Sequence, residues 1–350
     1  MDILPRMSDD LYASLGPGVR ARLVAEVSVP LRGTVRLLTD GFLAVPCARE
    51  VMVLDRALRV VSRFPVPEEL ARRYREPDGD IRVDVSPDRR WVVLAGTERM
   101  MVVDSTGRVA WHTTYPTFGD AGGDAVPACG VFSSDGSELW AFIPVLGPYA
   151  DENWVDDAER WVVRMSDWQI TGRAESRYRG ITDIITSPDG SRLGFAYFDG
   201  HHADGIWTAW HDNVESTPVR GGWFPLDVSP DGRHWLGGTW HDIVVGDFAG
   251  SAIRLNEDGQ WDHWEFTPGA CFLDPKQVLV AGRHDDEKNR HLLFRTDTLE
   301  PIGHIAYPAQ FPDEQKCGFV RGHGDGTWLT MHIPGYERPE EGRLCRWATC

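Results

Sequence analysis

The sequence predicts an all-β protein, a single seven-bladed β-propeller of four-stranded antiparallel blades whose ring is closed by the N-terminal strand. Two recurring markers predict it: a polar turn about every 47 residues, and an apolar strand that ends in Asp in each repeat. The composition agrees, since 15 Trp residues are spread along 350 residues and 42% of the chain is hydrophobic. Large flat side chains fill the space between packed sheets, and this apolar content supports a sizeable core.

The first marker is an apolar run, a Ser/Pro/Asp/Gly turn and a second apolar run. The residues just before the turns, at positions 85, 132, 186, 228 and, in a weaker copy, 273, are 47, 54, 42 and 45 apart. Pro fixes φ, Asp accepts hydrogen bonds within the turn, and Gly adopts positive φ. Each copy therefore predicts a hairpin between the first and second strands of a blade.

The second marker is an apolar strand that ends in Asp and is followed by a short turn. It recurs at Asp55, Asp104, Asp167, Asp212, Asp247 and Asp297. Each copy falls where the third strand of a blade is expected to end. The two markers keep phase over some 200 residues, which indicates true repetition.

The predicted blades are 35–65, 81–114, 129–175, 181–218, 223–256, 269–306 and 317–350. The last blade contains only three convincing strands, whereas the strand at 21–29 has no blade of its own. We therefore expect this strand to be the outer strand of the last blade, which closes the ring and protects its edges. Residues 1–18 are then an N-terminal extension, and 19–350 form a single domain.

The Ser-Pro-Asp-Gly turns resemble those of WD40-like repeats, the type found in the propeller part of TolB-like proteins. The Asp at the end of each strand resembles the Trp-Asp position of WD40 blades. The resemblance spans nearly the whole chain and implies the fold alone. The chain departs from true WD40 repeats, because no Gly-His precedes the blades and the one Trp-Asp pair, Trp261-Asp262, lies between blades. The His–Asp network of those repeats is therefore not implied here.

The formal charge of −17 disfavours nucleic acid and anionic membrane surfaces as partners. No export signal and no run of 18 apolar residues is visible, and the six Cys residues form no CxxC pair. We therefore expect a cytoplasmic protein with free thiols. Three of the cysteines, at 129, 271 and 317, fall in first strands, where a small apolar filler is the expected role and a soft-metal site the alternative.

Ligands are expected on the loops between second and third strands and between blades, on the side opposite the Ser-Pro-Asp turns. The aromatic residues there predict a binding platform for a protein, peptide or small molecule; the candidates are Tyr149, Trp154, Trp240 and Tyr336. No GxSxG, HExxH or phosphate-binding Gly-rich loop is present. A binding module is therefore the leading prediction.

The alternative is a metal-assisted hydrolase or lyase, because the same loops are rich in His. Candidate ligands for Zn, Fe or Mn are His202, His241, His284 and His332, with Asp285 or Glu287 as a candidate base. Imidazole and carboxylate groups are the usual ligands of such metals. The same residues are also common in exposed turns of an acidic protein, and the sequence leaves both interpretations open.

Overall fold

The computed structural model describes residues 18–31, 34–71, 81–115, 128–145, 157–176, 181–198, 203–209, 223–239, 241–256, 259, 261–284, 289–309, 311, 319–332 and 342–350. These residues form β-strands and one short helix, α2 (Glu68–Ala71). None of the helical segments in this part of the chain has the length and hydropathy needed to cross a membrane. Two compact units are present. One comprises 28–224 with 333–342, and the other comprises 225–332 with 1–27 and 343–350. They are called here the 28–224 unit and the 225–350 unit.

The 28–224 unit contains four antiparallel sheets whose strands follow one another in sequence order. The first is β2 (Arg36–Leu37), β3 (Leu43–Pro46), β4 (Glu50–Leu54) and β5 (Val60–Pro65). The second is β6 (Arg82–Val85), β7 (Trp91–Ala95), β8 (Arg99–Asp104) and β9 (Val109–Thr114). The third is β10 (Cys129–Phe132), β11 (Glu138–Val145), β12 (Asp157–Arg164) and β13 (Gln169–Ser176). The fourth shows three strands in the described residues, β14 (Ile181–Thr186), β15 (Arg192–Phe198) and β16 (Ala203–Ala209).

The 225–350 unit contains two sheets. One is β17 (Phe224–Val228), β18 (His234–Gly238), β19 (Ile243–Asp247) and β20 (Ala252–Arg254). The other has eight strands in the order β21-β22-β23-β24-β1-β27-β26-β25. Their bounds are β21 (Trp264–Asp274), β22 (Gln277–His284), β23 (Asn289–Arg295), β24 (Pro301–Ala306), β1 (Gly18–Val29), β25 (Val320–Gly322), β26 (Thr327–His332) and β27 (Gly342–Thr349).

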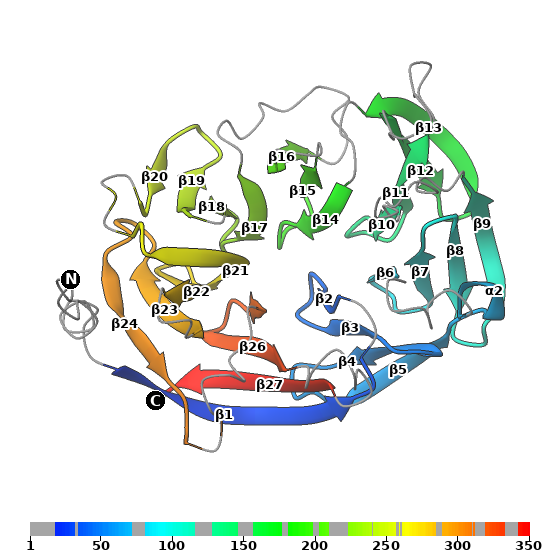
Figure 1. The fold of residues 1–350 in the computed structure, drawn as a ribbon. Coiled ribbons are helices and arrows are strands. Elements are labelled where there is room, and N and C mark those ends of the chain that lie inside the picture. Colours follow the sequence, from blue (N-terminus) through cyan, green and yellow to red (C-terminus); the bar gives the residue numbers. More distant parts are fainter. Residues whose placement is uncertain are drawn as a thin grey trace, which may run out of the picture. The chain divides into compact units, whose positions relative to one another are not determined.

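The N-terminal strand completes the last blade, as predicted. In Figure 1, β1 (blue) lies along β27 (red), its neighbour in the strand order. The backbone N–H of Cys350 donates to the carbonyl of Arg20 at 3.0 Å, and Arg343 pairs with Glu26. The sequence did not predict the second pairing of β1, which runs parallel to β24 over three residues, Gly18–Arg20 opposite His304–Ala306. The number of blades, seven, stays a prediction.

The Ser-Pro-Asp turns join first to second strands, which confirms the first marker. In the turn between β6 and β7, Ser86 Oγ donates to the Asp88 carboxylate at 2.6 Å and accepts the N–H of Trp91 at 3.0 Å. The same geometry recurs in three further turns, at Ser133/Asp135, Ser187/Asp189 and Ser229/Asp231. Their glycines have positive φ, 69° at Gly136, 67° at Gly190 and 71° at Gly232. Arg89 holds the equivalent position in the first copy with φ 56°.

Four of the strand-ending Asp residues, Asp55, Asp104, Asp167 and Asp247, accept backbone N–H groups of the turn between third and fourth strands. Asp247 accepts the N–H groups of Ala249, Gly250 and Ser251 at 2.8 to 3.0 Å. Asp104 accepts from the hydroxyl and N–H of Thr106 and from Arg108, and these hydrogen bonds lower the pKa of Asp104 to about 2. Asp212 lies outside the described residues.

Successive sheets of the 28–224 unit pack face to face. One buried cluster joins Val53 of the first sheet to Leu94 of the second, and another joins Val102 of the second to Leu139 of the third. A further cluster joins Trp140 of the third sheet to Ile184 and other residues of the fourth. Outer strands such as β5 and β9 alternate between exposed and partly buried residues. This stacking of four-stranded sheets is the blade packing of a β-propeller.

A buried polar network ties the last two blades of the 225–350 unit together. The Trp328 indole N–H donates to the Tyr307 hydroxyl at 2.9 Å, and the same hydroxyl is hydrogen-bonded to Nδ1 of His291. His291 and Trp328 are buried, and the rings of Tyr307 and Trp347 meet edge to face. The Tyr307 hydroxyl therefore joins a buried group of each of these two blades.

The cysteines behave as apolar fillers. Cys47, Cys129, Cys271 and Cys345 are free and buried, whereas Cys350 is exposed. Burial raises the pKa of the Cys47 thiol to about 12 and that of Cys271 well above its usual value. Protonated, buried thiols are poor nucleophiles and poor metal ligands. Cys317 lies outside the described residues.

Candidate functional site

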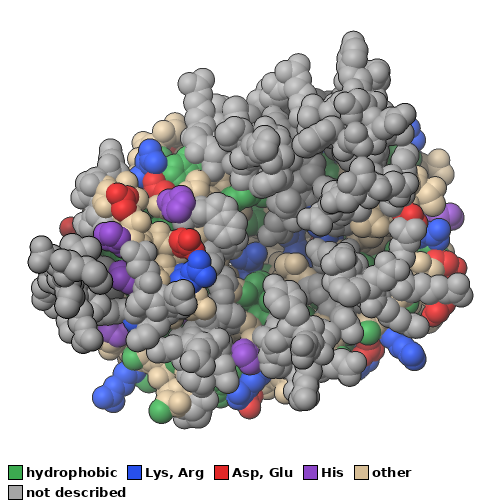
Figure 2. Space-filling model, in the orientation of Figure 1, with side chains coloured by type: hydrophobic (Ala, Val, Ile, Leu, Met, Phe, Trp, Pro, Cys, Tyr) green, Lys and Arg blue, Asp and Glu red, His purple; other side chains and the backbone are tan. Residues whose placement is uncertain are grey.

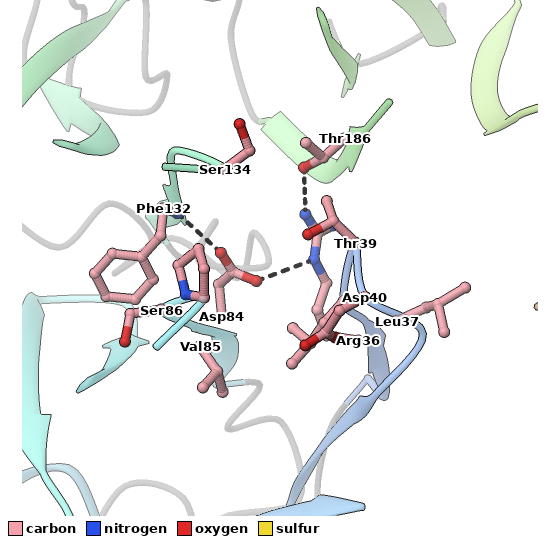
Figure 3. A pocket seen from close by; sticks show the side chains of 12 residues that line it. Arg36, Leu37, Thr39, Asp40, Asp84, Val85, Ser86, Phe132, Ser134 and Thr186 are labelled. Carbon is pink, nitrogen blue, oxygen red and sulfur yellow. Dashed lines mark hydrogen bonds and ion pairs between the residues drawn. The ribbon is translucent and has the colours of Figure 1, made fainter. Parts of the chain in front are cut away.

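A pocket lies within the 28–224 unit at the ends of four first strands. Its walls come from β2 and its turn (36–40), from β6 and its turn (84–87), from Phe132 and Ser134, and from Thr186 (Figure 3). The hollow is small and open to solvent. It is called here the turn-side pocket, because the turns between first and second strands form its rim.

The repeat itself places charges in the wall. Arg36 stands two residues before Leu38, whose N–H closes its turn on the carbonyl of Phe42. Asp84 stands two residues before Ser86, whose N–H closes the next turn on Trp91. Residues at the same repeat position of neighbouring blades come close together, so a basic and an acidic residue meet at the pocket wall.

The Arg36 guanidinium bridges two blades. Its Nε lies 3.5 Å from Oδ1 of Asp84, and its Nη2 donates to the Thr186 hydroxyl at 3.2 Å. Figure 3 shows the guanidinium between these two side chains. The Arg36 side chain keeps 16% of its surface exposed. It is thus a partly buried cation at the border of the hollow.

Asp84 joins two adjacent sheets by a hydrogen bond. It is 5% exposed, and its Oδ2 accepts the N–H of Phe132 in β10 at 2.9 Å. Burial raises the pKa of Asp84, and the charge of Arg36 and the bound N–H groups oppose that rise. The carboxylate is therefore an internal acceptor that holds β6 to β10.

The same hydrogen bond, from a backbone N–H of the next sheet to a buried Asp carboxylate, recurs in the 225–350 unit. Asp227 on β17 accepts the N–H of Phe272 on β21 at 2.8 Å and that of Val228 at 2.8 Å. Burial raises the pKa of Asp227 to about 7, and hydrogen bonds and the charge of Arg321 limit the rise. Asp227 precedes Ser229 by two residues, as Asp84 precedes Ser86.

Contacts between neighbouring turns hold the rim of the pocket. Arg89 pairs with Asp40 at 2.6 Å and stacks over the Phe42 ring, 3.6 Å from its centre. A Cβ added to Gly190 would lie 2.2 Å from Oγ of Ser134, so the third and fourth turns touch. The third turn also reaches the second, since a Cβ at Gly136 would lie 3.7 Å from Pro87. The rim is thus preorganised.

The sequence did not predict this pocket, because ligands were expected on the loops at the opposite side of the blades. A usable signal was present, however. First strands are mostly apolar, yet Arg36, Asp84, Asp227 and Arg321 stand at one repeat position, two residues before the turn. Charges on such a strand require partners.

Seven of the site residues predicted from the sequence lie outside the described residues: Tyr149, Trp154, His202, Trp240, Asp285, Glu287 and Tyr336. The prediction that the loop side is the docking side therefore stays a prediction. Eight of the 12 histidines lie between residues 225 and 332. Figure 2 shows histidine side chains gathered over that unit, where acidic and basic side chains are interspersed.

The three described candidate histidines have separate surroundings. His241 is exposed; its neighbour Asp242 is buried and accepts from Arg254 Nε at 3.0 Å and from the N–H of Asn256 at 2.9 Å. Asp242 is therefore used within its own blade.

His284 and His332 each lie beside a partner strand. His284 packs edge to face on Trp264, with ring centres 5.1 Å apart. His332 lies opposite Arg343, and burial together with that charge lowers its pKa. Within the described ranges, no group of three or more His, Cys, Asp or Glu residues could hold a metal ion.

Comparisons with known proteins show the fold. No family model matches the chain, and no curated protein matches it. The β-propeller domain of Cps50 (Swd1) from Myceliophthora thermophila superposes with a TM-score of 0.59 at 11% identity, covering 94% of this chain and all of that one. A chain of a mitotic checkpoint complex superposes with a TM-score of 0.60 at 11% identity, covering 96% of this chain and 98% of that one. The chain is therefore a β-propeller that resembles WD40 propellers in fold.

Proposed function

We propose that this β-propeller is a platform that binds a protein partner. The observation that carries the proposal is the turn-side pocket, a polar hollow with a partly buried arginine and a rim held by contacts between turns. A preorganised rim lowers the ordering cost that a partner must overcome on binding. One of the similar folds belongs to a protein complex, which agrees with this role.

Two surfaces of the platform are candidates for docking. The first is the turn side around Arg36. The second is the loop side, where the sequence places Tyr149, Trp154, Trp240 and Tyr336. Aromatic side chains are frequent anchors of protein interfaces, so the loop side belongs to the same proposal. The charge of −17 favours protein over nucleic acid as the partner, and the cytoplasm remains the expected compartment.

Crosslinking mass spectrometry on the tagged chain in cell extract tests the proposal. Three variants are compared with the wild type: Arg36→Gln on the turn side, Trp240→Ala/Tyr336→Ala on the loop side, and Arg164→Gln as a control. Arg164 is an exposed arginine paired with Asp167 at 2.7 Å, and it does not line the pocket, so its loss removes an equal charge outside the turn-side pocket.

We expect one protein to be enriched in near-equal amount with the wild type and the control, and to be lost with one of the other two variants. Which variant loses it identifies the docking side. If no protein is enriched over the bare matrix, or if both site variants retain it fully, the platform proposal is wrong.

A further inference from the structure

We propose that β1 is a dimerisation edge, along which the chain pairs antiparallel with β1 of a second copy. β1 has 12 residues and is the longest strand in the described part of the chain. One edge of β1 lies along β27, and β1 is on the outer side of that strand (Figure 1). The other edge, called here the outer edge, is in register with β24 over Gly18–Arg20. Among the described strands, none pairs with the outer edge of residues 21–27, and such an edge can accept another strand. The proposal does not depend on the proposed function.

A backbone hydrogen bond fixes which groups of β1 face the outer edge. The carbonyl of Arg20 accepts the N–H of Cys350, which follows β27, so this carbonyl points to the β27 side. The backbone groups of successive residues in a strand point to alternate edges. Those of the odd-numbered residues from 21 to 27 therefore point to the outer edge. A second strand would meet one donor and one acceptor at each of these residues.

The exposed side chains of β1 are complementary to themselves across a two-fold axis. Arg22, Val24 and Glu26 are exposed on one face of the strand, and Val24 keeps 41% of its surface exposed. When two copies pair antiparallel with Val24 opposite Val24, Arg22 of each copy lies opposite Glu26 of the other. These positions form non-hydrogen-bonded pairs, in which the side chains are closest. Opposite charges at such positions stabilise a sheet, and the two-fold axis forms both ion pairs at once.

Both charged groups are available for this pairing. Among the described residues, no acid forms an ion pair with Arg22. Glu26 pairs with Arg343 of its own chain, but Arg343 lies on β27 and a carboxylate can accept from two arginines. The second arginine would approach Glu26 from the outer edge. Because the chain carries a formal charge of −17, such local attraction is needed to offset repulsion between two copies.

The other outer strands that the structure describes are less suited to this pairing. β20 has three residues, and β5 ends in Pro65, which has no N–H to donate. Gly172 interrupts β13, and β24 contains Pro301 and Gly303. β9 contains neither Pro nor Gly, but it has no Asp, Glu, Lys or Arg. After Gly18, β1 combines length, an uninterrupted edge and charges of both signs.

Sedimentation velocity of the full chain over a micromolar concentration series tests the proposal. We expect a reversible monomer–dimer equilibrium with a dissociation constant in the micromolar range, because one strand pair is smaller than the interface of an obligate dimer. Ala25→Pro removes an N–H that points to the outer edge and leaves the β27 side intact, and edge strands tolerate such a proline. This variant should dimerise about tenfold more weakly or worse.

Exchange of charges tests the register. Arg22→Glu and Glu26→Arg each place like charges opposite one another, so each variant alone should dimerise about tenfold more weakly or worse. An equimolar mixture of the two should form a heterodimer about as readily as the wild type, because both opposed pairs are again opposite in charge. This recovery also shows that neither variant is misfolded. Arg164→Glu makes the same charge change at another exposed arginine and should leave dimerisation unchanged.

A crosslink at the two-fold axis gives an independent readout. The Cα atoms of a non-hydrogen-bonded pair lie about 4.5 Å apart, within the range of about 4.4–6.8 Å for disulfides. Because Cys350 is an exposed thiol, Val24→Cys is made in Cys350→Ser protein, which alone is the control. We expect mild oxidation to link two copies of the Val24→Cys protein and not the control. A wild type that stays monomeric, single charge variants that dimerise normally, a mixture without heterodimer, or a missing crosslink would overturn the inference.

Discussion

Asp227 should make stability depend on pH in a way that its amide analogue does not. In the wild type Oδ2 of Asp227 accepts the N–H of Phe272 and Oδ1 accepts the N–H of Val228. The substitution Asp227→Asn keeps one of these two acceptors and removes the titration, so its cost from the lost acceptor is the same at every pH. In the folded chain the pKa of this acid is raised from 3.8 to about 7, chiefly by burial. The folded state therefore holds the proton more tightly than the unfolded state does.

The sign follows from linkage. Between about pH 4 and pH 7 the unfolded chain has lost the Asp227 proton while the folded chain retains it, so the wild type loses stability as pH rises. The stabilisation from the protonated acid is complete below the unfolded pKa of 3.8 and is lost as pH rises through about 7. A pKa difference of about 3 corresponds to about 4 kcal/mol. Asp227 keeps part of its surface exposed to solvent, which screens its charge, so this figure is an upper bound.

Urea unfolding of the wild type and Asp227→Asn at pH 5 and pH 8 measures the effect. We expect the stability of the variant relative to the wild type to rise from pH 5 to pH 8 by up to about 2.6 kcal/mol, since only about two of the three pKa units are titrated in this window. Asp104→Asn is the control, because the pKa of Asp104 is lowered to about 2 and that group does not titrate in this window. A relative stability of Asp227→Asn that is the same at both pH values would refute the reasoning.

Four further predictions concern the fold and the site. Gly232→Ala should cost about 1–2 kcal/mol, because φ is 71° and a Cβ there meets no atom within 4 Å; thermal unfolding shows whether the cost is absent. Tyr307→Phe should cost about 1–3 kcal/mol, because the buried Trp328 indole N–H loses its acceptor, and an unchanged midpoint in urea would contradict that network. Deleting residues 1–30 removes β1 and should abolish cooperative melting, whereas deleting 1–17 should preserve it; a cooperative 1–30 deletion would disprove the role of β1. Elemental mass spectrometry should find no stoichiometric metal, and one equivalent of Zn, Fe or Mn that is lost in His241→Ala/His284→Ala would instead establish the metal-enzyme alternative.

The turns were predictable from the sequence because their chemistry is local. In Ser229-Pro230-Asp231-Gly232 the hydroxyl, the carboxylate and the positive φ all act within five residues. The N-terminal strand was predictable for another reason, since the last blade lacked one strand and the chain had one to spare. Its parallel pairing with β24 was not, because no local pattern records a contact over nearly 290 residues.

The pocket was not predictable because its parts come from four blades. The hydrogen bond of Asp84 spans 48 residues, that of Asp227 spans 45, and that of Arg36 to Thr186 spans 150. The first two separations are close to one repeat. Once the repeat length is known, the backbone N–H that such an acid will accept in the next blade can be predicted. A contact between blades three repeats apart can be found only from the folded structure.

One repeat position thus has two uses in this protein. In the 225–350 unit Asp227 accepts the N–H of Phe272 in the next blade, and the positive charge of Arg321 limits the rise in the pKa of that acid. In the 28–224 unit Asp84 accepts the N–H of Phe132 in the next blade in the same way. Here, however, Arg36 donates to the Thr186 hydroxyl and lines an open hollow. In each unit the acid accepts a backbone N–H of the next blade, so this hydrogen bond is the shared element of the repeat. Arg36 adds a second link in the 28–224 unit, because it joins the first blade to the second through Asp84 and to the fourth through Thr186.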